Sequence, residues 1–108
     1  MIDWTQVDEL RGEMGSAFAE LVDAFLEEVD DGILRVDPAS DAQAQASALH
    51  FLKGAALNLG FRDFARLCAT GEDNATHNRL PAVDIDSLNA CYQQSRAEFL
   101  AGLARRAA

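Results

Sequence analysis

Apolar residues recur every three or four positions through most of the chain, which is the spacing that places them along one face of a helix. The clearest case is residues 16–36, where a long apolar stripe is separated from a series of acidic side chains. The stripe comprises Phe18, Leu21, Val22, Phe25, Leu26, Val29, Ile33 and Val36. The acidic residues that fall mostly away from it are Glu20, Asp23, Glu27, Glu28, Asp30 and Asp31. The pattern predicts an amphipathic helix that ends at Asp37 and Pro38, because proline disfavours a helical conformation in the residue before it.

Capping signals delimit the helices on either side of this one. Asp3 is a suitable N-cap for a short helix over residues 3–11, in which apolar residues again recur at helical spacing. Ser40 as N-cap, with Gln43 at the third helical position, forms the sequence pattern of a capping box. The pattern predicts another long helix that begins at Ser40 and breaks at Gly60.

Two further helices are expected in the second half of the chain. One spans residues 61–76 and is followed by a turn at residues 78–81, and Asp84 is the expected N-cap of the last. The first of the two is expected to bury Phe64, Leu67, Cys68 and Gly71. The inward-facing residues of the last are expected to be Leu88, Cys91, Tyr92, Ser95, Phe99 and Leu103.

Four long amphipathic helices joined by short connections are most simply arranged as an antiparallel up-down four-helix bundle. We therefore expect an all-α fold of this type with a short additional N-terminal helix. The length of 108 residues suits a single domain over residues 1–108. A bundle that buries all four apolar stripes is expected to be a monomer.

Composition narrows the classes of function. The formal net charge of −9 argues against a nucleic-acid partner, whose phosphates would be repelled. The sequence has no apolar stretch of the ~18 residues that a membrane-spanning helix needs, and no signal peptide pattern opens it. Cys68 and Cys91 have no metal-ligand spacing around them, so we expect core thiols in a reducing compartment. A soluble protein of the cytoplasm is the expectation.

The helix that ends at Gly60 carries the candidate chemistry. At about 100° per residue, the apolar face comprises Leu49, Leu52, Ala56 and Leu59. His50, Gly54 and Leu57 fall on the opposite side, with Lys53 at its edge. Glycine inside a helix costs roughly 0.5–1 kcal/mol relative to alanine, so Gly54 requires a reason. An outward imidazole beside a cation and a bare stretch of backbone suits a histidine that carries a phosphoryl group and is approached closely by another protein.

The residues of this helix resemble the motif of the histidine-containing phosphotransfer (HPt) domains of two-component phosphorelays. Those that match in register are His50, Leu52, Lys53, Gly54, Ala55, Ala56, Asn58 and Gly60. The resemblance implies a cytoplasmic helical bundle that is phosphorylated on histidine and does not make a phosphate bond from ATP itself. The implied partners are response-regulator receiver domains, a sensor histidine kinase or both.

Within that resemblance each site residue has an expected role. His50 accepts the phosphoryl group, Lys53 offsets its charge, and Gly54 leaves room for the receiver. Leu57 and Ala46 flank the site and, with Asn58, are expected to contribute to docking. No cofactor of its own is expected, because the receiver supplies the acceptor aspartate and the bound Mg²⁺.

Three alternatives remain at this point. A histidine kinase phosphoacceptor domain typically has an acidic residue directly after the histidine, where this chain has Phe51, and no ATP-binding domain follows. A helical interaction module could bind signalling partners through the same face without carrying phosphate. A metal-binding bundle would need a Glu or His one turn from His50, which is absent.

The other histidine, His77, is interpreted as a loop residue. The sequence does not identify the kinase, the receivers, the pathway or the direction of phosphate flow.

Overall fold

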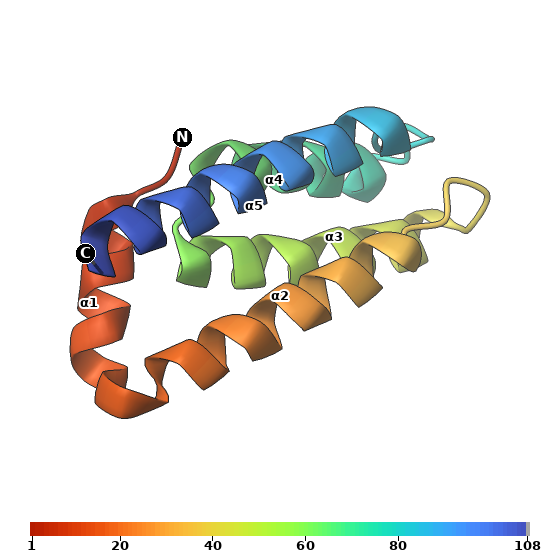
Figure 1. Cartoon of the computed structure of the whole chain (residues 1–108). Helices are drawn as coiled ribbons and strands as arrows, with labels where there is room; N and C mark the ends of the chain where they lie inside the picture. Colours follow the sequence, from red (N-terminus) through yellow and green to blue (C-terminus); the bar gives the residue numbers. More distant parts are fainter. Residues whose placement is uncertain (108) are drawn as a thin grey trace.

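The computed structural model describes residues 1–107, which form five α-helices and one short 3₁₀ helix (Figure 1). The elements are α1 (Trp4–Met14), η1 (Gly15–Ala17), α2 (Phe18–Leu34), α3 (Ala42–Leu59), α4 (Arg62–Thr76) and α5 (Ile85–Ala107). The prediction of an all-α protein is confirmed. Ala108, the last residue of the predicted domain, lies outside the described residues.

The four long helices lie lengthwise beside one another, and α1 lies across the end of the molecule where the chain begins (Figure 1). The most extensive contact joins α3 to α4, while α2 packs against α3 and α5 packs against α4. The N-terminal segment is fixed to the corner between α3 and α4, because the backbone N–H of Asp3 donates to the carbonyl of Gly60 at 2.8 Å. The helix pair α3–α4 is therefore the centre of the structure.

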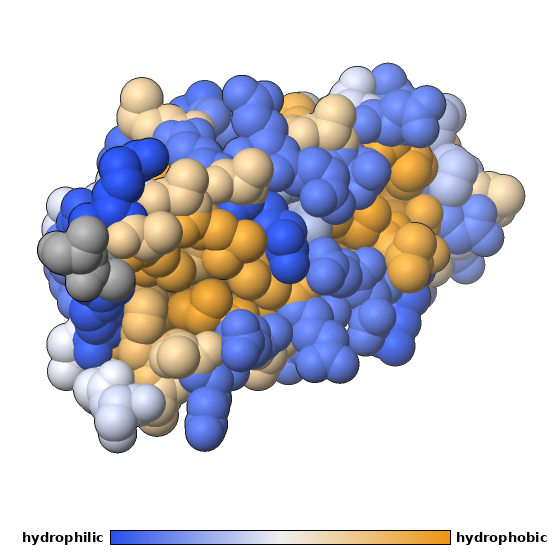
Figure 2. Space-filling view, in the orientation of Figure 1, coloured by the Kyte–Doolittle hydropathy of each residue, from blue (hydrophilic) through white to orange (hydrophobic). Residues whose placement is uncertain are grey.

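Much of the core comes from the apolar stripes that the helical spacing predicts. The expected α3 face (Leu49, Leu52, Ala56 and Leu59) is fully buried. Aromatic rings join the later helices: the Phe61 and Phe99 ring centroids are 5.2 Å apart, and those of Phe64 and Tyr92 are 5.3 Å apart. Figure 2 shows apolar surface between α2 and α5. Phe25 of α2 and Leu103 of α5 are among the partly buried residues that pack against the core.

The two ends of α3 are capped by different means. At its start the Asp41 carboxylate accepts from the backbone N–H of Ala44 at 2.8 Å, so Asp41 is the N-cap. The predicted capping box of Ser40 and Gln43 is wrong, because the Ser40 hydroxyl instead donates to the carbonyl of Asp37. At its end Gly60 has a left-handed conformation with φ of 73°, which confirms the predicted break.

Two other expectations need correction. The first helix continues to Met14 instead of ending near Arg11, because the change of backbone conformation that ends it comes at Gly15, whose φ is 53°. Leu67 was expected to be buried and is 37% exposed. It lies about 60° around the helix from Phe64, and it faces a hollow that Val83 and Leu88 also line.

Gln45 is a buried polar residue for which the apolar pattern had no place. Its side-chain amide donates to the carbonyls of Ser40 at 2.7 Å and Pro38 at 3.3 Å. Its side-chain oxygen accepts from the backbone N–H of Ala82 at 3.0 Å. One glutamine thus joins the loop before α3 to the loop before α5, and each buried polar group finds a partner.

Candidate functional site

The candidate site lies on the outward face of α3, at the position that the helical spacing predicts. The side chain of His50 is 69% exposed, and Leu57 is 56% exposed. A Cβ atom added at Gly54 would meet no heavy atom within 4 Å beyond its chain neighbours and the backbone of its own helix. Gly54 therefore serves no close packing between helices, and the backbone next to the imidazole is open to solvent.

A carboxylate from α4 binds both functional side chains of α3. Glu72 Oε2 lies 2.8 Å from His50 Nδ1, and Glu72 Oε1 accepts from Lys53 Nζ at 2.5 Å. The Glu72 side chain is three-quarters buried, since only 24% of it is exposed. The hydrogen bond from Lys53, and to a smaller extent the hydrogen bond from His50, holds the pKa of the Glu72 carboxyl below its usual range. Glu72 is therefore ionised at neutral pH.

This contact determines which imidazole nitrogen is reactive. An ionised carboxylate can only accept hydrogen bonds. Nδ1 of His50 must therefore carry the proton and donate a hydrogen bond to Glu72. In the neutral imidazole the lone pair is then on Nε2. The arrangement presents a nucleophilic nitrogen on an exposed ring, and the hydrogen bond to Glu72 fixes the tautomer of that ring.

Lys53 lies at the edge of the exposed face, with 29% of its side chain exposed. The sequence predicts it beside a phosphoryl group on His50. The structure places its ammonium group on the same carboxylate that binds His50, so its positive charge is already matched by Glu72. The three side chains together are close to neutral when the imidazole is neutral.

Glu72 is the site residue that the sequence analysis missed. An antiparallel pair of helices brings together residues at similar distances from the corner between them. His50 lies ten residues before Gly60, and Glu72 lies twelve residues after it. Counting outward from the predicted corner places Thr70 opposite His50, and Glu72 and Asp73 are the nearest acidic residues to that position.

The residues expected to contribute to docking differ in accessibility. Leu57 and Asn58 are exposed, whereas Ala46 is partly buried against the core. Phe51 is 48% exposed on the other side of His50, where its ring packs over Gly32 of α2. The open apolar surface near the histidine is thus formed by Leu57 and Phe51 more than by Ala46.

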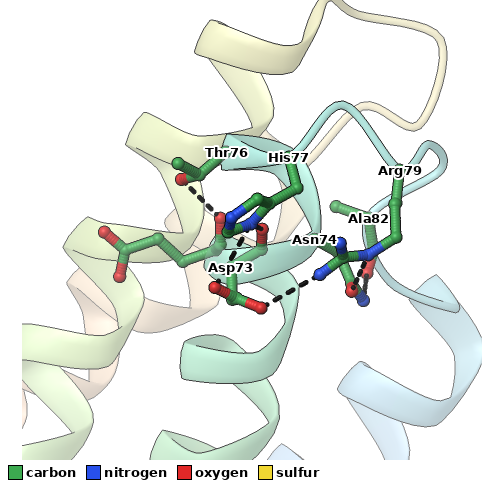
Figure 3. Close-up of polar contacts among 7 residues, drawn as sticks. Asp73, Asn74, Thr76, His77, Arg79 and Ala82 are labelled. Carbon is green, nitrogen blue, oxygen red and sulfur yellow. Dashed lines mark hydrogen bonds and ion pairs between the residues drawn. The ribbon is translucent and has the colours of Figure 1, made fainter.

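The turn after α4 holds Glu72's end of that helix in place, and His77 belongs to it (Figure 3). His77 Nδ1 contacts the carbonyl of Asp73 at 2.9 Å, and Arg79 pairs with the Asp73 carboxylate at 3.0 Å. Asn74 donates to the carbonyl of Ala82 at 3.1 Å. His77 is the C-cap that follows α4, which agrees with its interpretation as a loop residue.

Replacing Glu72 should change the tautomer of His50 and slow any reaction at Nε2. In E72A the Nδ1 proton loses its acceptor, so we expect the fraction of the Nε2-protonated tautomer to rise. A reaction at Nε2 should slow by about tenfold, with partial recovery in E72Q, whose amide oxygen still accepts a hydrogen bond. Long-range ¹H–¹⁵N spectra of the imidazole measure the tautomer directly. E28A, which removes an exposed carboxylate of α2, is the control. An unchanged His50 tautomer in E72A would refute this role.

Three general features bear on the class of site. Within residues 1–107, no three His, Cys, Asp or Glu side chains gather into a group that could hold a metal ion. None of the helices in the described part of the chain combines the length and the apolar character that crossing a membrane requires. Both cysteines, Cys68 and Cys91, are free thiols, and burial raises the pKa of Cys68 to about 12.

Comparison with known proteins gives one match. The family model described as the Hpt domain matches residues 6–98, which include all of α2, α3 and α4. Searches of curated proteins and of solved structures found no match to the chain.

Proposed function

Because the chain belongs to the Hpt domain family, whose members carry phosphoryl groups on histidine within phosphorelays, we propose that His50 is the phosphoacceptor of this protein. The observation that carries the proposal is the contact of His50 Nδ1 with Glu72 at 2.8 Å on a ring that is 69% exposed. It leaves the nucleophilic nitrogen accessible to a second protein. The four long helices, as an antiparallel up-down bundle, hold this ring on a rigid scaffold.

The proposed reaction is phosphoryl transfer between this ring and an aspartate of a receiver domain. The Nε2 lone pair forms a bond to phosphorus while the bond from phosphorus to the aspartyl oxygen breaks, and the aspartate leaves as a carboxylate. The proton on Nδ1 stays in place, so the phosphorylated ring acquires positive charge. Glu72 stabilises that charge through its hydrogen bond. The reverse reaction returns the phosphoryl group to an aspartate.

The transfer also requires that the phosphoryl charge is offset and that Nε2 can be reached, and Lys53 and Gly54 meet these two requirements. The Lys53 ammonium lies one helical turn from His50, near enough to offset part of the phosphoryl charge. Because Lys53 is also paired with Glu72, we propose that it only partly neutralises the phosphoryl group, which keeps that group easy to transfer. Gly54 leaves the approach to Nε2 open.

The receiver supplies the rest of the chemistry. We propose that its acceptor aspartate and bound Mg²⁺ close over His50, with Leu57 and Asn58 among the docking residues and Ala46 at the margin. Hpt domains are phosphoryl carriers and not kinases, so ATP alone should not label this protein. We propose that it acts in this way as a monomer in the cytoplasm.

A labelled-phosphate assay tests the function. The protein would be incubated with receiver domains from the same genome, each phosphorylated on aspartate with acetyl [³²P]phosphate. We expect label on this chain that is stable in base and labile in acid, as a phosphoramidate is, and no label with ATP alone. Receivers that bind the protein without labelling it would show instead an interaction module that carries no phosphate.

A further inference from the structure

The two sides of the site carry opposite charge. The helix α2 (Phe18–Leu34), which packs on one side of α3, contains six acidic residues and no Lys or Arg. All six are exposed. The first half of α4, on the other side of α3, presents Arg62 and Arg66. In a protein with a net charge of −9, this basic region next to the candidate histidine requires an explanation.

These arginines line a groove between α3 and α4. Its lining residues are Lys53, Leu57, Arg62, Ala65, Arg66 and Ala69. Three of the chain's nine basic residues are among them, and no acidic residue is. The groove begins at Lys53, one helical turn from His50, and ends at Arg62, where α4 begins. A protein that covers His50 from this side must also cover the groove.

The arginine side chains are available to a partner. The nearest carboxylate to Arg62 is Asp3 at 3.7 Å, and the nearest to Arg66 is Asp63 at 3.8 Å. The Arg66 and Arg62 side chains are 76% and 56% exposed. Exposed ion pairs with such long separations contribute little to stability, so the guanidinium groups can turn toward another protein at small cost.

We propose that this α3–α4 groove is the docking surface for an acidic segment of the receiver domain, beside the receiver's acceptor aspartate. The proposal rests on the proposed function. A receiver binds Mg²⁺ through one or two carboxylates beside its acceptor aspartate, so we expect an acidic segment next to that site. Arg62 and Arg66 attract that segment, the six carboxylates of α2 repel it, and Leu57 supplies an apolar contact between them. Opposite charges on the two sides of His50 thereby orient the partner.

Charge reversal in the groove provides the test. In R62E/R66E, we expect the second-order rate constant for phosphoryl transfer from a phosphorylated receiver to fall about tenfold or more at low salt. The first-order rate within the saturated complex should stay within about twofold of wild type, because neither side chain touches His50. Raising the salt concentration should bring the wild-type rate toward that of the variant. Acidic residues are favourable near a helix N-terminus, so the variant should fold, which circular dichroism and Tm would verify.

The matched control is on the other side of the site. Arg35 is exposed at the end of α2 and lines the hollow beside Phe51. R35E and R66E change the net charge equally, so a general charge effect would slow both. We expect R66E to be slower and R35E to stay near the wild-type rate. Equal rates in R62E/R66E and wild type would overturn the groove proposal, as would a larger loss in R35E, which would place docking at α2.

Failure of the proposed function would give a different labelling result from failure of the groove proposal. Potassium phosphoramidate is a small donor that reaches exposed histidines without any docking. Wild type and R62E/R66E should be labelled by it at equal rates. A wild-type protein that takes phosphate from phosphoramidate but from no receiver would overturn the proposed function, and the groove proposal would fail with it. Labelling of the wild type by receivers with no change in the arginine variants would overturn the groove proposal alone.

Discussion

Phosphate acceptance is expected to disappear in H50Q, while the domain stays folded. The imidazole is 69% exposed, and its one side-chain hydrogen bond within residues 1–107 is to Glu72. Glutamine can still approach that carboxylate with its amide, so the free energy of unfolding should change by less than about 1 kcal/mol. Nothing else on this face offers a nitrogen with an available lone pair. Transfer from a phosphorylated receiver, followed by gel autoradiography and normalised to folded protein, measures the loss.

The second histidine of the chain is the natural control for this variant. His77 is also exposed but contacts the backbone carbonyl of Asp73 at the end of α4. H77Q should accept phosphate at the wild-type rate. Normal uptake by H50Q would remove His50 from the mechanism, and uptake lost only in H77Q would transfer the role to His77. A loss of several kcal/mol in H50Q would show that the ring is part of the core.

A leucine at position 54 should reduce phosphoryl transfer by at least tenfold without harming the fold. A Cβ atom there meets no heavy atom within 4 Å, so the free domain has room for a larger side chain. In G54A the free energy of unfolding should rise by up to about 1 kcal/mol, because alanine has less backbone freedom to lose on folding. Its transfer rate should fall less than that of G54L. Thermal unfolding and receiver-to-domain transfer rates, measured on the same preparations, test both parts.

Gly60 is the matched control, because its replacement should lower stability and leave transfer unchanged. Its φ is 73°, and an added Cβ would lie 2.7 Å from the carbonyl oxygen of Asp3. We expect G60A to lose roughly 1–3 kcal/mol of stability, because a side chain is strained in this conformation. Transfer per folded molecule should be unchanged. Full transfer activity in G54L would show that the receiver approaches His50 from elsewhere. A destabilised G54A with unchanged transfer per folded molecule would show that the glycine serves helix packing.

The helical spacing alone predicted which residues of α3 face the core. An amphipathic helix has a fixed period, so knowing that Leu49 and Leu52 are buried also places His50 and Gly54 outside. The same reasoning identified the buried stripe of α2 and the break at Gly60. These features depend on residues close together in the chain, and a sequence pattern can express them.

Contacts between helices were harder to predict from the sequence. Ser40 and Asp41 are both good N-caps, and the difference between them depends on the tight turn in which Ser40 bonds back to Asp37. The exposure of Leu67 depends on how α5 begins, which the period of α4 does not contain. Glu72 reads in the sequence as one more acidic residue among eighteen. Its role emerges only when α4 lies against α3 and its carboxylate meets His50 and Lys53.

The same limit applies to the basic groove. Arg62 and Arg66 are separated from Lys53 by the corner at Gly60, and nothing in the local pattern shows that the three line one surface. The sequence reveals the overall charge of −9, and that number conceals the opposite charges on the two sides of the site. Local periodicity therefore located the histidine, whereas its partners required the packing of helices.

In the proposed reaction a receiver phosphorylates His50 at Nε2, while Nδ1 keeps its proton and donates a hydrogen bond to Glu72. The most direct measurement is a long-range ¹H–¹⁵N spectrum of the uniformly ¹⁵N-labelled protein, recorded before and after incubation with a phosphorylated receiver. We expect the Nε2 signal of His50 to shift to the position of a phosphorylated nitrogen, while Nδ1 stays protonated in both spectra. A phosphoryl group on Nδ1 of His50, or on any residue other than His50, would contradict the proposed reaction.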